Sequence, residues 1–163
     1  MTRDGDCWMD ESISDACACA VAFRDAIDRA VASGALAGTA ISSFPRGCCG
    51  YASDLLQRYF KEHGIYSCYV CGTFSGDTAF DDQSHAWLEL PDGTVVDITG
   101  DQFRLAQGPL HNELKVYCGK PNAFYSSFGR IERFDSVEST SPSVVRKENE
   151  MYEIVCRYLH ALS

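Results

Sequence analysis

The chain has 163 residues, of which 45% are hydrophobic and 12% aromatic, and its formal net charge is −9. This length and composition predict one folded domain over residues 1–163 rather than a disordered chain or two domains. The acidic charge, without a cluster of Lys and Arg, excludes a typical nucleic-acid surface, because binding phosphate needs clustered basic side chains.

The first part of the chain predicts a cytoplasmic protein that begins with a helix. Nine cysteines is an odd count, and residues 1–12 are acidic where a signal peptide would be basic and then apolar, so we expect a reducing cytoplasm. An apolar stripe at spacings of three and four predicts a helix over residues 13–33 that ends near Ser33 and Gly34. Charged residues interrupt the apolar stretch 13–37, so it does not predict a membrane span.

The middle of the chain predicts a second helix followed by strands. An apolar stripe from Ala52 to Phe60 indicates a helix that begins at or beside Cys49 and stops at Gly64. Residues 65–74 are rich in aromatic and β-branched side chains and predict a strand, with an acidic loop at 76–83 after it. Residues 85–90 and 94–99 are two more strand-like runs, and the Pro-Asp-Gly between them is typical of a hairpin.

The C-terminal part is less regular. Residues 115–118 predict a further strand, and residues 134–142, rich in Ser and acidic residues, predict an exposed connection. One helical face over residues 147–162 carries an apolar stripe, so we expect the chain to close with a helix docked on the sheet.

Cys49, at the predicted start of the second helix, is our candidate nucleophile. A thiol attacks a carbonyl only as the thiolate, and unpaired N–H groups at a helix N-terminus stabilise that charge and the oxyanion formed on attack. The reaction also needs an imidazole base held in one tautomer by a third group. His85 at the start of one strand and Asp97 on its partner strand supply this pair.

The chain carries GCCGYAS at residues 47–53, HGIYSCYVCG at 63–72 and SHAWLELPDGTVVDIT at 84–99. In this order and on these predicted elements, the segments resemble transglutaminase-like domains of the papain-like cysteine enzyme superfamily. The resemblance covers about residues 44–103. It implies an α+β, papain-like fold in which the nucleophile helix packs on an antiparallel sheet, with flanking helices at 13–33 and 147–162.

The same resemblance implies that Cys49 is the nucleophile, His85 the general base and acid, and Asp97 the group that orients the imidazole. It implies acyl transfer through a thioester without a cofactor or a metal. Because the chain is short, we expect hydrolysis of an amide or peptide bond in a protein or peptide substrate. We expect no nucleic-acid or membrane partner, and the sequence leaves the oligomeric state open.

Two assignments in the triad have alternatives. Cys48 adjoins Cys49, although the Gly-x-Cys spacing favours Cys49. A two-residue turn at Asp92 and Gly93 would put Asp97 on the opposite sheet face from His85. A three-residue turn over 92–94 would correct the face and set Asp101 opposite His85, so Asp101 is the alternative third member. Gln102, next in sequence, could donate to the substrate or the oxyanion.

The other cysteines are interpreted as structural, because cysteine is among the most buried residue types. This applies to Cys17, Cys19, Cys118 and Cys156. Cys68 and Cys71 form a Cys-x-x-Cys pair, which we interpret as strand residues rather than zinc ligands because a second pair at workable spacing is missing.

Three other functions remain open at this stage. An amine acceptor would make the protein a transglutaminase or acyltransferase, and a protein that keeps the fold without catalysis would be a peptide-binding module. The cysteine count also fits a redox or zinc protein.

Overall fold

The computed structural model describes residues 5–74, 83–136 and 138–160, with side chains from residue 13 onward. Its helices and strands, in chain order, are α1 (Gly5–Ala32), α2 (Cys49–Glu62), β1 (Cys68–Phe74), β2 (Ser84–Glu89), β3 (Val95–Asp97), the 3-10 turns η1 (Gly100–Phe103) and η2 (Gly108–Leu110), β4 (Tyr117–Gly119), α3 (Ala123–Ser126), β5 (Phe128–Phe134) and α4 (Pro142–His160). The expected acidic loop at 76–83 lies almost wholly outside the described residues.

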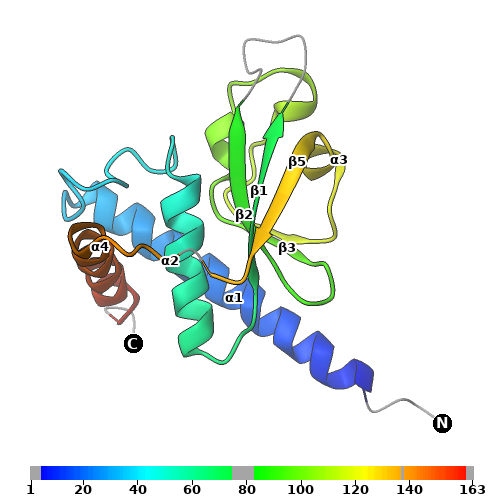
Figure 1. The fold of residues 1–163 in the computed structure, drawn as a ribbon, viewed down its shortest axis with the longest axis horizontal. Helices are drawn as coiled ribbons and strands as arrows, with labels where there is room; N and C mark the ends of the chain where they lie inside the picture. The colour runs from blue at the N-terminus through cyan, green and yellow to red at the C-terminus, as the bar shows by residue number, and fades with distance from the viewer. Residues whose placement is uncertain (1–4, 75–82, 137, 161–163) are drawn as a thin grey trace.

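The strands form one antiparallel sheet in the order β4-β3-β2-β1-β5, and α1, α2 and α4 gather on one side of it (Figure 1). The structure is therefore α+β, as the sequence predicted. α2 packs on β2 and β1, whereas α4 packs mainly against α1. The expectation that the last helix docks on the sheet is wrong, because its apolar face, with Met151, Tyr152 and Val155, is buried among the helices.

Helix α2 is positioned by its apolar stripe and by two polar side chains. Ala52, Leu55, Leu56 and Phe60 are buried in the core between the helices and the sheet. The Ser53 hydroxyl donates to the Ala86 carbonyl of β2 at 3.3 Å. The Gln57 amide donates to the carbonyls of Ser67 and Asp135, both at 2.9 Å. The axial position of α2 against β2 is thereby fixed, and with it the place of Cys49.

The β2–β3 hairpin turns through Pro91, Asp92 and Gly93. The Leu90 N–H donates to the Thr94 carbonyl at 2.8 Å, and Gly93 has φ +87°, a conformation that glycine adopts without strain. Leu88 pairs with Val96 and Glu89 with Val95. The turn thus has three residues, but it begins one residue earlier than the three-residue turn considered from the sequence. Continuing this register sets Asp97 opposite Trp87, on the sheet face of His85.

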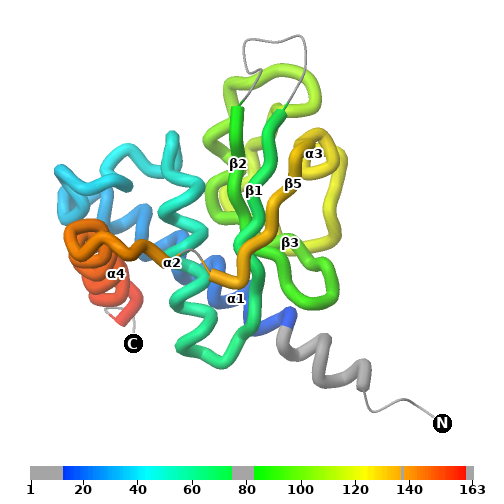
Figure 2. Tube along the Cα trace, viewed as in Figure 1, coloured from blue at the N-terminus to red at the C-terminus, as the bar shows by residue number. Residues whose placement is uncertain are grey.

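The sequence did not predict the edge strand β5 or the short elements α3, η1 and η2. β5 lies beside β1 along the sheet edge (Figure 2), and most of its side chains are exposed. A Cβ added to Gly72 would lie 2.6 Å from Ile131 Cδ1, so the glycine permits this close pairing. Phe128 of β5 and Phe124 and Tyr125 of α3 join Trp87 in a second core, distinct from the core beneath the helices.

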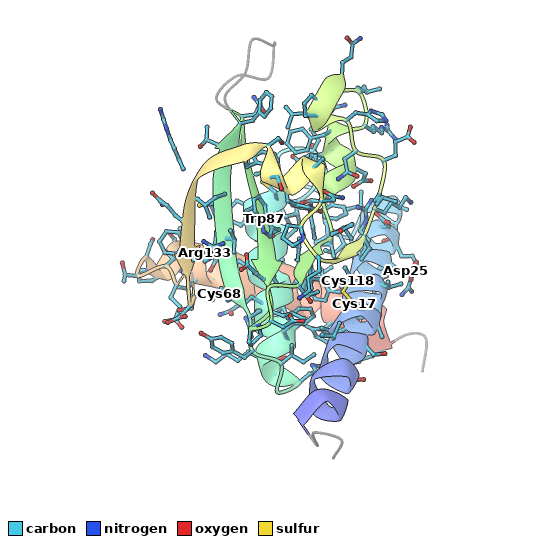
Figure 3. All side chains as sticks on the ribbon, turned by 90° about the vertical axis from the view of Figure 1, so that its right-hand side faces the viewer. Cys17, Asp25, Cys68, Trp87, Cys118 and Arg133 are labelled. Carbon is cyan, nitrogen blue, oxygen red and sulfur yellow. A yellow bond between two sulfur atoms is a disulfide. The ribbon has the colours of Figure 1, made fainter. Side chains whose placement is uncertain are left out.

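Cys17 of α1 and Cys118 of β4 form a disulfide (Figure 3). From the sequence, both are expected only to be buried structural cysteines. The pairing was not foreseeable from spacing, because the two residues are 101 positions apart. The bond attaches the first helix to the edge strand opposite β5.

Removing this disulfide should lower the free energy of unfolding by about 2–4 kcal/mol, because closing so long a loop removes much entropy from the unfolded chain. Urea unfolding of the wild type, followed by circular dichroism with and without dithiothreitol, measures the loss. Cys17→Ser should show the same loss and no further response to dithiothreitol. Identical unfolding of the wild type in both conditions would contradict the disulfide.

Candidate active site

The three residues predicted from the sequence to act together come from three elements. Cys49 is the first residue of α2, His85 is the second residue of β2, and Asp97 is the last residue of β3. His85 Nε2 donates to Asp97 Oδ2 at 2.7 Å, and both side chains are buried. Since the carboxylate can only accept, this bond places a proton on Nε2 and leaves Nδ1 to face Cys49.

The surroundings of Cys49 favour its thiolate. Burial raises the pKa of the thiol, but the hydrogen bond and charge of His85, the Ala86 backbone N–H and the Gln102 side chain together lower it below its ordinary value. The free N–H groups of the first turn of α2 add to this effect. A thiol in such a position is ionised and nucleophilic at a lower pH than an ordinary cysteine.

Cys48 differs from Cys49 in its position, its burial and the direction in which its pKa is shifted. It precedes α2 as the N-cap residue, it is buried, and its thiol donates to the Arg46 carbonyl at 3.2 Å. Burial, with the neighbouring Cys49 charge, raises the pKa of Cys48 to about 11. Of the two adjacent cysteines, only Cys49 has a thiol whose pKa is lowered.

Asp97 is held as a carboxylate by four donors. Besides His85, the Tyr125 hydroxyl donates to Oδ2 at 2.9 Å, and the backbone N–H and hydroxyl of Thr99 donate to Oδ1 at 2.8 and 3.2 Å. Burial raises the pKa of Asp97, but His85 and these donors outweigh it and the pKa is lowered. Nothing in the sequence pointed to Tyr125, because α3 was not predicted.

The His85 imidazole is favoured in its charged form. Burial lowers its pKa, but the charge and hydrogen bond of Asp97, followed by those of Cys49, raise it to about 9. The ring lies against aromatic side chains of the second core, namely Trp87, Phe103, Phe124 and Phe128. Trp87 is therefore a core residue, consistent with a strand tryptophan.

Asp101 does not reach His85 in this register. It lies in η1, and its two carboxylate oxygens accept from Arg24 Nη1 and Nη2 at 2.7 and 2.9 Å. Arg24 is buried and also donates to the Ile98 and Lys115 carbonyls. Asp101 is thus committed to a buried ion pair, and Asp97 is the carboxylate that contacts the imidazole.

Gln102 is the fourth polar residue at the centre. Its Oε1 accepts from the Gly47 N–H at 3.3 Å, which orients the amide so that Nε2 lies 2.9 Å from His85 Nδ1 and can donate to it while the imidazole is neutral. The same amide contributes to the lowered pKa of Cys49. The sequence allows a donor role for Gln102 although its spacing does not require one, and the structure brings its amide to both Cys49 and His85.

The Cys-x-x-Cys pair lies on β1, and His63 lies at the end of α2. Cys68 and Cys71 are unbonded residues of β1, and among the described residues no group of His, Cys, Asp and Glu is arranged to hold a metal ion. His63 Nδ1 contacts the Tyr59 carbonyl at 2.8 Å at the end of α2, as expected for a histidine at a helix C-terminus. Within the part of the chain that is described, no helix is long and apolar enough to cross a bilayer.

No family model, curated protein or solved structure matches the chain. The geometry of the Cys49 centre is therefore the basis for assigning a function to the chain.

Proposed function

We propose that the chain is a cysteine-dependent acyl-transfer enzyme with a papain-like fold, in which Cys49, His85 and Asp97 act as nucleophile, general base and acid, and orienting carboxylate. The observation that carries the proposal is the placement of His85 between a thiol of lowered pKa and a buried, fully hydrogen-bonded carboxylate. Structural ion pairs seldom combine these features with a partly exposed cysteine at a helix start.

The first half-reaction is acylation. The Cys49 thiolate attacks the carbonyl carbon of an amide, and the carbonyl electrons move onto the oxygen. Backbone N–H groups at the start of α2 and the Gln102 Nε2 group are the donors that we assign to this oxyanion. His85 gives its Nδ1 proton to the departing amine as the C–N bond breaks, and a thioester remains on Cys49.

The second half-reaction regenerates the thiolate. Neutral His85 takes a proton from water, the resulting hydroxide adds to the thioester, and the C–S bond breaks. The products are a carboxylic acid and the Cys49 thiolate beside a protonated His85. Asp97 keeps its charge throughout, and its function is to hold the ring and stabilise the imidazolium.

Hydrolysis of a protein or peptide substrate is the outcome that we propose first. An amine in place of water would give a transglutaminase or acyltransferase with the same residues, and loss of turnover would leave a peptide-binding module. We also propose a cytoplasmic setting. A disulfide between Cys17 and Cys118 is more typical of an oxidising compartment, so the redox state of this pair in cells tests that setting.

Iodoacetamide should alkylate Cys49 ahead of the other described free cysteines at mildly acidic pH. The reason is that the pKa of Cys49 lies below its ordinary value, whereas burial raises the pKa of Cys48, Cys71 and Cys156. The measurement is peptide mass spectrometry of the labelled protein at about pH 6, where an ordinary thiol is almost wholly protonated.

Labelling of Cys49 should disappear in Cys49→Ser and should persist in Cys48→Ser, which is the matched control. His85→Ala should slow it at mildly acidic pH, because the imidazolium no longer lowers the pKa of the thiol. Preferential labelling of Cys48, or equally slow labelling of every cysteine, would refute the assignment of the nucleophile.

A further inference from the structure

A hollow with a volume of about 380 Å³ lies beside the proposed catalytic centre. One wall comes from the loop before α2, with Phe44, Pro45 and Arg46. The other comes from η1 and the residues after it, with Gln102, Arg104 and Leu105. The volume is sufficient for one amino-acid side chain with surrounding water.

Gln102 connects this hollow to the reacting atoms. The residue lines the hollow, yet its amide contacts His85 Nδ1 and the Gly47 N–H, and Gly47 is two residues before Cys49. A substrate group in the hollow is therefore separated from the thiol by little more than the Gln102 amide. A peptide bound with its reacting carbonyl at Cys49 could thus place a neighbouring side chain in the hollow.

The charge of the hollow is opposite to that of the whole protein. Arg46 and Arg104 are exposed, and neither has an ion-pair partner among the described residues. The single acidic residue of the lining, Asp101, is neutralised by Arg24. Two arginines without a described ion-pair partner thus line one hollow in a chain with a net charge of −9.

We propose that this hollow is a specificity subsite that binds the carboxylate side chain of an acidic residue adjacent to the bond that Cys49 attacks. The inference rests on the proposed acyl-transfer function. Arginine forms paired hydrogen bonds with a carboxylate, and Phe44, Pro45 and Leu105 offer apolar contact to the methylene groups that carry it. The substrate class is then a peptide with Glu or Asp beside the reacting carbonyl.

The test uses peptide chloromethyl ketones that differ only in Glu or Gln, placed either at the residue bearing the ketone or at the residue before it. These compounds alkylate Cys49, and the second-order rate of labelling is measured by mass spectrometry. The wild type should react about 10-fold or more faster with the Glu compound in one of the two positions, as expected for charge-assisted hydrogen bonds. Raising the salt concentration should shrink this preference.

The double variant Arg46→Gln, Arg104→Gln should lose the preference, which is measured as the ratio of the Glu and Gln rates within one variant, so that any change in the intrinsic reactivity of Cys49 cancels. Arg146→Gln removes the same kind of charge from an exposed position on α4 and should keep the preference. Equal rates with Glu and Gln compounds in the wild type, or a preference that survives in the double variant, would overturn the inference.

Labelling with iodoacetamide distinguishes a failure of the proposed function from a failure of the proposed subsite. A Cys49 that iodoacetamide does not label selectively refutes the proposed function itself. If iodoacetamide labels Cys49 selectively, two results would refute the subsite alone. One is equal rates with the Glu and Gln compounds at both peptide positions, and the other is no reaction with any peptide compound.

Discussion

His85→Ala should lower the rate of Cys49 acylation by a factor on the order of 10³ or more. The substitution removes the group that gives a proton to the leaving amine, together with the hydrogen bond and charge that lower the pKa of Cys49. Single-turnover formation of the acyl-enzyme from an activated amide, followed by mass spectrometry, measures this rate directly. Circular dichroism of the variant must match the wild type, since an unfolded protein would also be inactive.

Substitutions of the two candidate carboxylates, Asp97 and Asp101, provide the matched comparison for the acylation experiment. Asp97→Asn should cause a smaller but still large loss, because a neutral amide lets the imidazole adopt the wrong tautomer. Asp101→Asn should do much less to the rate, since Asp101 contacts Arg24 and not His85. Crippled acylation in Asp101→Asn with normal acylation in Asp97→Asn would refute the hairpin register. Wild-type rates in all three variants would refute the triad and favour a binding module.

Arg24→Met should destabilise the fold by about 3–5 kcal/mol, because it leaves the Asp101 carboxylate buried without its partner. Methionine keeps much of the apolar volume that Arg24 places over the Phe44 ring, so the loss reports mainly on charge. Urea unfolding followed by circular dichroism measures the change in unfolding free energy.

Arg29→Met is the control, since Arg29 is more exposed. It pairs with Asp25 within one helix, an interaction that contributes about 0.3–0.5 kcal/mol, and it donates one hydrogen bond to the Tyr158 carbonyl. Adding Asp101→Asn to Arg24→Met should recover part of the stability, because the unpaired charge is then gone. A loss in Arg24→Met no larger than in Arg29→Met would contradict the buried ion pair.

Local patterns in the sequence predicted the elements that carry the candidate site. The stripe from Ala52 to Phe60 was sufficient to place α2, and with it Cys49 at a helix start. The hairpin was predicted from Pro-Asp-Gly, but its register was not. An Asp-Gly pair is compatible with turns of two and three residues, and one residue of difference moves Asp97 to the other face of the sheet.

What the sequence did not predict depends on contacts between distant segments. Tyr125 reaches Asp97 only because α3 folds against the second sheet face, and α3 is too short to show a periodic pattern. Buried and exposed side chains alternate only weakly along β5, and most of them are exposed. The position of β5 beside β1 therefore follows from strand pairing rather than from burial of an apolar face. The Arg24 ion pair and the Cys17–Cys118 bond likewise join residues that no local rule connects.

Helix α1 is attached at two points to the part of the chain that follows β3. Cys17 is bonded to Cys118, and Arg24 is paired with Asp101, two helical turns further along the same face. A helix attached at one point can still rotate about that point. Attachment at two points on one face prevents the helix from sliding along its axis and from rotating about it. The same arginine lies over Phe44 in the wall opposite η1. Through this one arginine, α1 contacts both walls of the hollow beside Gln102, although it contributes no residue to the lining.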